Sequence, residues 1–349
     1  MDRRRLGSGD LIFGRYEVIA LAGVGATSFV YRCRDGEDRE VAVKVLHDDL
    51  MGDKAARRRF LREAHLLKQL DHPNIVKVHD IIETPLMLAY AMDHVEGQTL
   101  KAWLRDRASA GFDAEARIIA LELLSALGHI HAQGVIHRDI KPANIMLDSV
   151  TLDGVSGCAR IRLIDFGVAR LTDADPDPED IEAIRGTAAY ISPDEIRSPF
   201  EVCPASDLYS LGVVFYEMAA GERPFEGRPG PELLCAHLHT TPLRPSHHND
   251  GLNEHLDALI MRLLAKTPEA RFGSCVELER ALVQALAADL EIDIPIVVEE
   301  APTLDLQWLA MLQVVLMHLL MTVLSTGNTG QPDDPHHFSR PYIDFPAVV

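Results

Sequence analysis

Hydrophobic positions alternate with polar ones early in the chain and later recur with helical spacing. From Tyr16 to about Leu46, β-branched and aromatic runs are separated by glycines, a pattern typical of strands joined by tight turns. Residues 54–70 follow with apolar side chains on one helical face, and residues 75–92 return to strand-like runs. The pattern predicts a small β-rich unit that contains one helix.

Beyond residue 97 the apolar positions recur every three to four residues. Four helices are expected there, over residues 114–133, 207–220, 252–265 and 276–289. The first two should end at Gly134 and Gly221, because glycine readily takes the left-handed conformation that closes a helix. The expected fold class is therefore α+β, with a β-rich lobe over about 14–95 and a larger helical lobe over about 96–290.

The composition is that of a globular protein in a reducing compartment. With 47% hydrophobic and 25% charged residues, the 349-residue chain can bury a large core. Its net charge of −19 argues against nucleic acid as the main partner, since phosphate backbones are bound by excess Lys and Arg. The five cysteines are scattered, so neither a zinc site nor a disulfide framework is expected. Residues 1–13, a short extension, lack the apolar run of a secretory signal, and we expect a cytoplasmic domain.

Two short polar motifs carry candidate chemistry. Residues 137–144 read His-Arg-Asp-Ile-Lys-Pro-Ala-Asn, which places a carboxylate (Asp139), an ammonium (Lys141) and an amide (Asn144) within one turn. An Asp-Phe-Gly motif that begins at Asp165 adds a second carboxylate. Phosphoryl transfer from ATP requires such a set: an acid that orients the attacking hydroxyl, a cation near the moving group, and oxygen ligands for magnesium.

A glycine pair between two strand-like runs is a candidate phosphate-binding turn. It reads Gly-Val-Gly-Ala-Thr-Ser-Phe-Val at residues 23–30, and glycines let backbone N–H groups approach phosphates without an intervening Cβ. Lys44, one of seven lysines in the chain, stands on the next expected strand. Glu63 shares a helical face with apolar residues, so an inward acid that needs a cationic partner is expected there; a solvated acid is the alternative.

In their order and spacing these motifs resemble those of Hanks-type serine/threonine protein kinases, and the bacterial members most. The resemblance covers about residues 14–290 and implies a two-lobed protein-kinase-like fold. It also implies ATP, Mg²⁺ with Mn²⁺ as an alternative, and protein substrates with serine or threonine acceptors. Lys141, two residues after Asp139, is typical of serine/threonine kinases rather than tyrosine kinases.

The resemblance implies a role for each matching residue at the nucleotide site. Lys44 would bind the α- and β-phosphates and pair with Glu63. Asp139 would be the catalytic base with Lys141 beside it, and the magnesium ligands would be Asn144 and Asp165. The nucleotide would lie against the glycine-rich turn, the hinge and the floor of the site, at Gly23, Val24, Gly25, Ala26, Ser28, Val30, Ala42, Met92, Asp93, Val95 and Met146.

Matching residues of the larger lobe would support the site. Thr187 would bond toward the catalytic aspartate, Asp207 would hold the catalytic loop from the helix beneath, and Arg271 would form a buried ion pair. The usual glutamate partner of Arg271 is replaced by Asp194, one methylene shorter, with Glu195 next to it. A buried arginine without a partner would cost on the order of 3–5 kcal/mol, so we expect one of these two acids to pair with it.

The activation segment, residues 168–185, has one hydroxyl, that of Thr172. Phosphorylation of such a segment gives the arginine after the catalytic histidine an anion to bind. Where many relatives place the phosphothreonine, this chain has an alanine beside Glu182, in an acidic stretch broken by prolines. We therefore expect Arg138 and Arg170 to meet Glu182 or a neighbouring acid, without need for phosphorylation. A solvated acidic loop is the alternative.

The tail, residues 291–349, differs in character from the kinase-like part. Residues 308–324 are apolar all round and would span roughly 25 Å as a helix, against about 30 Å of hydrocarbon. Neither flank carries the Lys or Arg that would mark a cytoplasmic side. Two interpretations stay open: a single-pass anchor in the inner membrane, or a helix that packs on the larger lobe or on the second subunit of a homodimer.

The function predicted from the sequence is that of a serine/threonine protein kinase. The first alternative is a pseudokinase, a signalling scaffold on the same fold, which would be expected to have lost Lys44, Asp139 or Asp165. All three are present. The second alternative is a small-molecule phosphotransferase of related fold, which usually lacks Lys141 and Arg271.

Overall fold

The structure is a computed structural model of the chain. It describes residues 5–107, 111–152, 155–167, 169–171, 188–227 and 230–289. Three predictions therefore fall outside the described residues: the positions of Glu182 and Thr187, and the conformation of the apolar segment 308–324.

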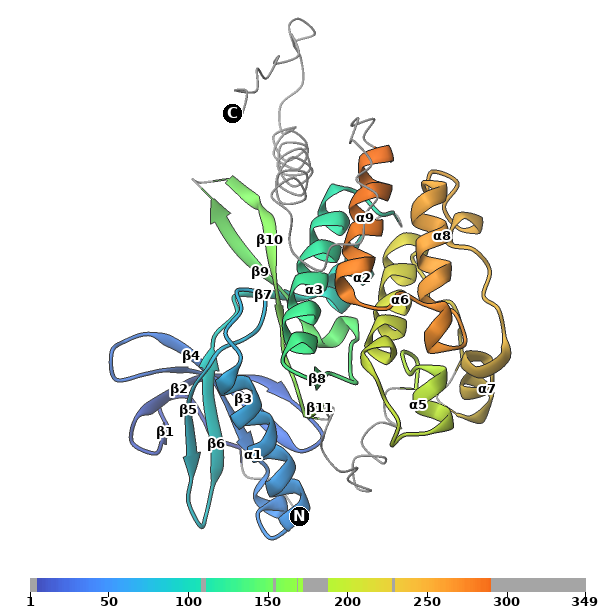
Figure 1. Cartoon of the computed structure of the whole chain (residues 1–349). Coiled ribbons are helices and arrows are strands. Elements are labelled where there is room, and N and C mark those ends of the chain that lie inside the picture. Colours follow the sequence, from blue (N-terminus) through green and yellow to red (C-terminus); the bar gives the residue numbers. More distant parts are fainter. Residues whose placement is uncertain are drawn as a thin grey trace, which may run out of the picture.

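An antiparallel sheet of six strands forms the smaller lobe (Figure 1). The strands are β1 (Leu11–Ile12), β2 (Tyr16–Val24), β3 (Ser28–Arg34), β4 (Glu40–Leu46), β5 (Val78–Glu83) and β6 (Leu88–Asp93), in the spatial order β1-β2-β3-β4-β6-β5. Side chains such as Val18, Tyr31, Val43 and Ala91 build one buried cluster, because alternate residues of a strand face the same side. The strands predicted over 16–46 and 75–92 are confirmed.

Helix α1 (Lys54–Gln69) covers one face of this sheet and lies beside β5 (Figure 1). It begins where Asp53 accepts hydrogen bonds from two backbone amides of the first turn, which satisfies donors that the helix itself cannot. Its buried face includes Phe60, Leu67 and one acid, Glu63. The apolar stripe that fixes the helix on the sheet thus also carries a carboxylate inward.

The larger lobe is helical. Its helices are α2 (Leu100–Asp106), α3 (Ala114–Ala132), α5 (Pro193–Arg197), α6 (Pro204–Ala220), α7 (Pro231–His239), α8 (Glu254–Leu263) and α9 (Cys275–Asp289). Short 3₁₀ turns occur at Asp48–Leu50 in the smaller lobe and at Pro142–Asn144, Pro245–His247 and Pro268–Ala270 in the larger one. All four predicted helices are confirmed, and both Gly134 and Gly221 have positive φ at the helix ends as expected. The short helices α2, α5 and α7 were not predicted from the sequence.

Helix α6 lies at the centre of the larger lobe and is buried nearly all round. It passes so close to α8 that a Cβ built on Gly212 would lie 2.6 Å from the Cβ of Leu263. Only glycine fits at this approach. This approach fixes the middle of α6 against α8, and the first turn of the same helix carries the buried Asp207.

Two small sheets carry the polar motifs. The strands β7 (Gly97–Thr99), β9 (Ile145–Leu152) and β10 (Val155–Leu163) form one, and β8 (Val135–Ile136) with β11 (Arg170–Leu171) forms the other. His137 follows β8 directly, Asn144 directly precedes β9, and Asp165 comes two residues after β10. Backbone bonds from Leu163 to Asn74 and from Val76 to Leu163 tie the end of β10 to the smaller lobe. The motifs predicted as catalytic are thus held at the junction of the two lobes.

Candidate active site

Lys44, Glu63 and Asp165 meet where the lobes join, although they lie on β4, on α1 and after β10. The ammonium Nζ of Lys44 is 2.7 Å from Oε1 of Glu63 and 3.3 Å from Oδ1 of Asp165. The side chains of Lys44 and Glu63 are only 12% and 4% exposed, so the pair is largely removed from water. Glu63 is therefore the inward, paired acid expected from the sequence, and not a solvated one.

Each charged group of this cluster shifts the pKa of its neighbours. Burial alone would lower the pKa of Lys44, but the carboxylates of Asp165 and Glu63 hold it well above its usual value. The Lys44 ammonium in turn holds the pKa of Asp165 well below the usual range of a carboxyl group, against the effect of burial. Asp165 is thus ionised and Lys44 is protonated at neutral pH.

Tyr90, on β6, completes this cluster. Its hydroxyl donates to Oε1 of Glu63 at 2.9 Å, and the backbone N–H of Phe166 donates to the same oxygen at 3.3 Å. The ring of Tyr90 contacts Phe60 of α1, with the ring centroids 5.1 Å apart. Tyr90 was not predicted from the sequence. The available signal was a phenol within the apolar run 88–92, since a buried tyrosine hydroxyl needs a partner.

A second cluster forms around Asp139. Lys141 Nζ donates to both carboxylate oxygens of Asp139, at 2.9 and 2.6 Å. Asn144 Nδ2 donates to Oδ2 of Asp139 at 2.8 Å and to its backbone oxygen at 2.9 Å. The three residues predicted to act at the transferred group are therefore in direct contact, and the carboxylate is held in one orientation.

Backbone geometry brings the two clusters together. The N–H of Ile164 donates to the backbone oxygen of Asn144 at 2.9 Å, so Asp165, the next residue, begins beside Asn144. The ring of Phe166 contacts that of His137, with the centroids 4.4 Å apart. Asp165 itself has a positive φ of 64°, which is uncommon for a residue with a side chain. An outlier of this kind persists only where the surroundings hold it, and such positions concentrate at functional sites.

The predicted phosphate-binding turn joins β2 to β3. Gly25 N–H donates to the backbone oxygen of Ser28 at 2.8 Å, which closes the turn. Strand register places Val30 opposite both Gly23 and Lys44. Gly23 and Lys44 therefore lie on either side of β3, at the same level of the sheet. Val24 at the turn is exposed.

The predicted hinge and adenine contacts lie on two different sheets. Met92 pairs with Ala42 across β6 and β4, and Asp93 ends β6. The side chain of Asp93 turns to the smaller lobe, where it accepts from Lys77 N–H at 3.2 Å. Met146 lies on β9, directly after Asn144 and Ile145.

Asp207 of α6 holds the start of the 137–144 loop, as expected. Its two carboxylate oxygens accept the backbone N–H groups of His137 and Arg138, each at 2.8 Å. Arg138 has a positive φ of 66°, so these bonds stabilise an uncommon backbone conformation just before Asp139. His131 Nε2 lies 2.7 Å from the same carboxylate and was not predicted from the sequence.

The structure resolves which acid pairs with Arg271. Nη2 of Arg271 is 2.5 Å from Oδ1 of Asp194, while its Nε and Nη1 donate to the backbone oxygens of Ala265 and Ala205. The prediction that one of the two acids pairs with this arginine is confirmed. Glu195 takes a different partner, Arg138, at 2.8 Å from Nε. The acidic stretch expected to meet Arg138 lies outside the described residues.

The protein kinase domain family matches residues 16–283 of this sequence. The chain belongs to the protein kinase family. It is 38% identical over 276 residues to the serine/threonine-protein kinase PknB of Mycobacterium tuberculosis, covering 77% of this chain and 42% of that protein. It is 32% identical over 282 residues to PrkC of Bacillus subtilis, covering 80% of this chain and 42% of that protein.

A solved structure agrees with this assignment. The crystal structure of the Mycobacterium tuberculosis PknI kinase domain superposes with a TM-score of 0.60 at 30% identity, over 80% of this chain and 100% of that one. The kinase is therefore of the bacterial Hanks type, as the motifs implied. It spans less than half the length of the curated relatives PknB and PrkC.

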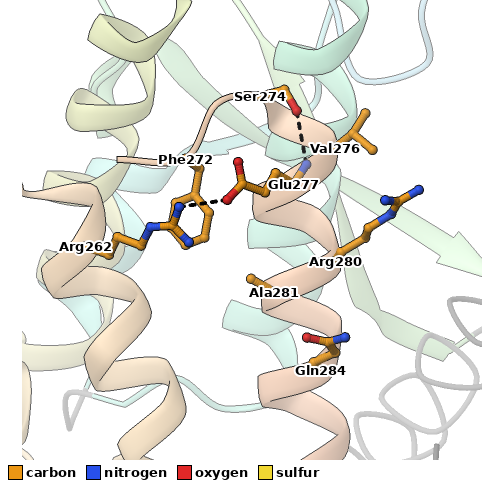
Figure 2. Close-up of a pocket in the computed structure, with 8 residues that line it drawn as sticks. All are labelled: Arg262, Phe272, Ser274, Val276, Glu277, Arg280, Ala281 and Gln284. Carbon is orange, nitrogen blue, oxygen red and sulfur yellow. Dashed lines mark hydrogen bonds and ion pairs between the residues drawn. The ribbon is translucent and has the colours of Figure 1, made fainter. Parts of the chain in front are cut away.

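A pocket of about 500 Å³ lies between α8 and the start of α9, apart from the residues above. Figure 2 shows Arg262 of α8 crossing the ring of Phe272 and reaching Glu277. The guanidinium carbon is 3.9 Å from the ring centroid, and Nη2 is 2.7 Å from the Glu277 carboxylate. The charges of Arg262 and Glu277 thus satisfy each other.

Proposed function

We propose that this kinase transfers the γ-phosphoryl group of ATP to serine and threonine hydroxyls of proteins. The observation that carries this function is the convergence of Lys44, Glu63 and Asp165 beside the cluster of Lys141 and Asn144 on Asp139. Phosphoryl transfer needs little covalent chemistry from the protein and depends on positioned charges. These charges are already paired and oriented.

Lys44 is the group that binds the α- and β-phosphates, and Glu63 aims it. The short Lys44–Glu63 contact inside the smaller lobe supports this role, since a buried lysine with an anchored ammonium has lost its freedom to turn elsewhere. Asp139 orients the attacking hydroxyl, with its carboxylate held by Lys141 and Asn144. Lys141 also balances charge on the transferred group.

Asn144 and Asp165 are the residues that hold Mg²⁺, or Mn²⁺ in its place. The donor set fits: Asp165 is kept ionised by Lys44, and Asn144 retains its amide oxygen because Nδ2 makes the contacts to Asp139. Hard divalent cations prefer carboxylate and amide oxygens together with phosphate oxygens. When bound, the metal neutralises charge on the nucleotide phosphates.

The substrates and setting of the kinase follow from the same proposal. Its acceptors are proteins with serine or threonine hydroxyls, and its catalytic domain acts in the cytoplasm. No helix in the described ranges combines the length and apolar character needed to cross a membrane. A membrane anchor or a dimer contact through residues 308–324 stays a prediction from the sequence.

Transfer of radiolabel from γ-labelled ATP to a generic protein substrate tests this function. Asp165→Ala and Asp139→Asn should each lower incorporation by about a hundredfold or more, because each removes a group that acts on the transition state. Asp106→Ala, which changes an exposed acid of α2, is the matched control and should keep wild-type activity. Mass spectrometry should find the label on serine or threonine. Equal incorporation by Asp165→Ala and wild type would reject the metal site and with it the kinase function.

A further inference from the structure

Two consecutive acids on helix α5 pair with two different arginines. Asp194 contacts Arg271, at the turn before α9, and Glu195 contacts Arg138 in the catalytic loop. Ser192 begins the helix, and its hydroxyl accepts the N–H of Glu195 at 3.2 Å. Asp194 thus fixes this short helix to the core of the larger lobe, and Glu195 fixes it to the catalytic loop.

The Arg138–Glu195 pair is buried. Both side chains are 2% exposed, with Nε of Arg138 2.8 Å from Oε1 of Glu195. Nη2 of Arg138 also donates to the backbone oxygen of Pro199 at 3.2 Å. Because the backbone N–H of Arg138 is bound by Asp207, the residue is held at both ends. It directly precedes Asp139.

In kinases controlled by their activation segment, a phosphate on that segment supplies the anion that binds such an arginine. In this structure a carboxylate from α5 already occupies that position. A phosphate that took the place of Glu195 at Nε of Arg138 would leave a buried carboxylate without its partner. The sequence offers one hydroxyl for modification in residues 168–185, that of Thr172.

We propose that Glu195 is a built-in anion that holds Arg138, and through it Asp139, in the position for catalysis without phosphorylation of the activation segment. This role rests on the proposed kinase activity and concerns its regulation. Glu195 acts through Arg138 and does not touch the reacting atoms, so it is a positioning residue. The sequence led us to expect that a carboxylate takes the place of the phosphate. In this proposal the carboxylate is that of Glu195, which lies outside the activation segment.

The surroundings of Glu195 give the pair a recognisable pH signature. Burial raises the pKa of Glu195 to about 7 despite the opposing effect of Arg138, and the nearby carboxylates of Asp207 and Asp194 act in the same direction as burial. Below pH 7 the side chain gains a proton and the ion pair is lost. The turnover number should therefore fall below pH 7 through a step that disappears when position 195 cannot titrate.

The experiment uses the full chain, treated with a protein phosphatase and verified by mass spectrometry. The variants are Glu195→Gln, Arg138→Ala, their combination and Thr172→Ala, with Glu201→Gln as the control because Glu201 is an exposed acid just beyond α5. Dephosphorylated wild type, Thr172→Ala and Glu201→Gln should match the untreated protein. Glu195→Gln should lower kcat about tenfold or more and leave KM for ATP within about twofold.

The combined variant separates positioning from general structure. If Glu195 acts only through Arg138, adding Glu195→Gln to Arg138→Ala should cause no further loss of kcat. The proposal is overturned by wild-type kcat in Glu195→Gln, by independent losses in the combined variant, or by a dephosphorylated wild type that regains activity only after phosphorylation. That last result would leave the proposed kinase function intact. If neither the wild type nor any variant transferred phosphate, both the kinase function and the role of Glu195 would be rejected. Should Glu195→Gln fail to fold, Glu195→Met, an uncharged side chain of similar length, takes its place, and an unaltered kcat there overturns the proposal.

Discussion

The hydroxyl of Tyr90 donates a 2.9 Å hydrogen bond to Oε1 of Glu63, the same oxygen that accepts from Lys44. A buried carboxylate is stable only when its oxygens are satisfied, and this one receives the phenol, the ammonium and the N–H of Phe166. Tyr90 lies on β6 of the sheet, and Phe166 comes three residues after β10. Hydrogen bonds to the Glu63 carboxylate therefore connect α1 with the sheet and with the Asp-Phe-Gly motif.

Tyr90→Phe should weaken the hold on the Glu63 carboxylate while keeping the ring that contacts Phe60. The loss of one hydrogen bond to a charged acceptor should lower the free energy of unfolding by about 1.5–3 kcal/mol. It should also lower kcat/KM for ATP by about threefold to thirtyfold, because Glu63 then aims Lys44 less firmly. ATP titrations of activity and urea unfolding measure both effects.

Tyr31→Phe is the matched control for this prediction. Tyr31 is a buried tyrosine of the same lobe whose hydroxyl accepts the backbone N–H of Leu6 at 3.1 Å, away from the lysine. It should lose stability without loss of kcat/KM for ATP. If Tyr90→Phe kept the wild-type kcat/KM, the hydroxyl would have no part in holding Glu63 for nucleotide binding.

The sequence predicted the two lobes and the polar residues that meet between them because both depend on local patterns. Strand alternation, helical periodicity and motif spacing are read within a few residues, and contacts such as Lys44–Glu63 follow from the family resemblance. Tyr90 and His131 were missed because their partners come from elements distant in sequence. The short helices α2, α5 and α7 were missed because one or two turns give too little periodicity to detect.

The choice between Asp194 and Glu195 also lay beyond the sequence. Successive residues of a helix point about 100° apart, so only one of two neighbours can face a given partner. Once α5 forms from Pro193, its orientation turns Asp194 to Arg271 and Glu195 to Arg138. The sequence correctly required a partner for Arg271, but the second ion pair depends on tertiary geometry alone.

Asp194→Ala should be among the most destabilising substitutions of a largely buried residue in the larger lobe. It leaves the fully buried guanidinium of Arg271 without its carboxylate, at a cost of about 3–5 kcal/mol in the free energy of unfolding. Adding Arg271→Met should recover part of the loss, because no charge then stays unpaired. Urea unfolding of the single and combined variants measures this. A loss below about 1 kcal/mol for Asp194→Ala would show that the backbone oxygens of Ala205 and Ala265 suffice for the arginine.

The contact of His131 with Asp207 should make stability depend on pH in the alkaline range. Burial alone would lower the pKa of His131, but the hydrogen bonds to Asp207 and Cys275, together with the charge of Asp207, outweigh it and raise the pKa to about 10. The folded state therefore holds a proton that the unfolded state releases near pH 6.5. This contribution to stability is fully present below pH 6.5 and is lost as pH rises toward 10, with a slope of up to about 1.4 kcal/mol per pH unit.

Urea unfolding at several pH values between 6.5 and 10 tests this coupling. The free energy of unfolding of wild type should fall across the window more steeply than that of His131→Gln, whose amide cannot titrate. His65→Gln, which changes an exposed histidine of α1, should keep the wild-type slope. Parallel slopes for wild type and His131→Gln would mean that His131 is neutral in the folded protein. Asp207 would then hold the N–H groups of His137 and Arg138 without the help of a cation.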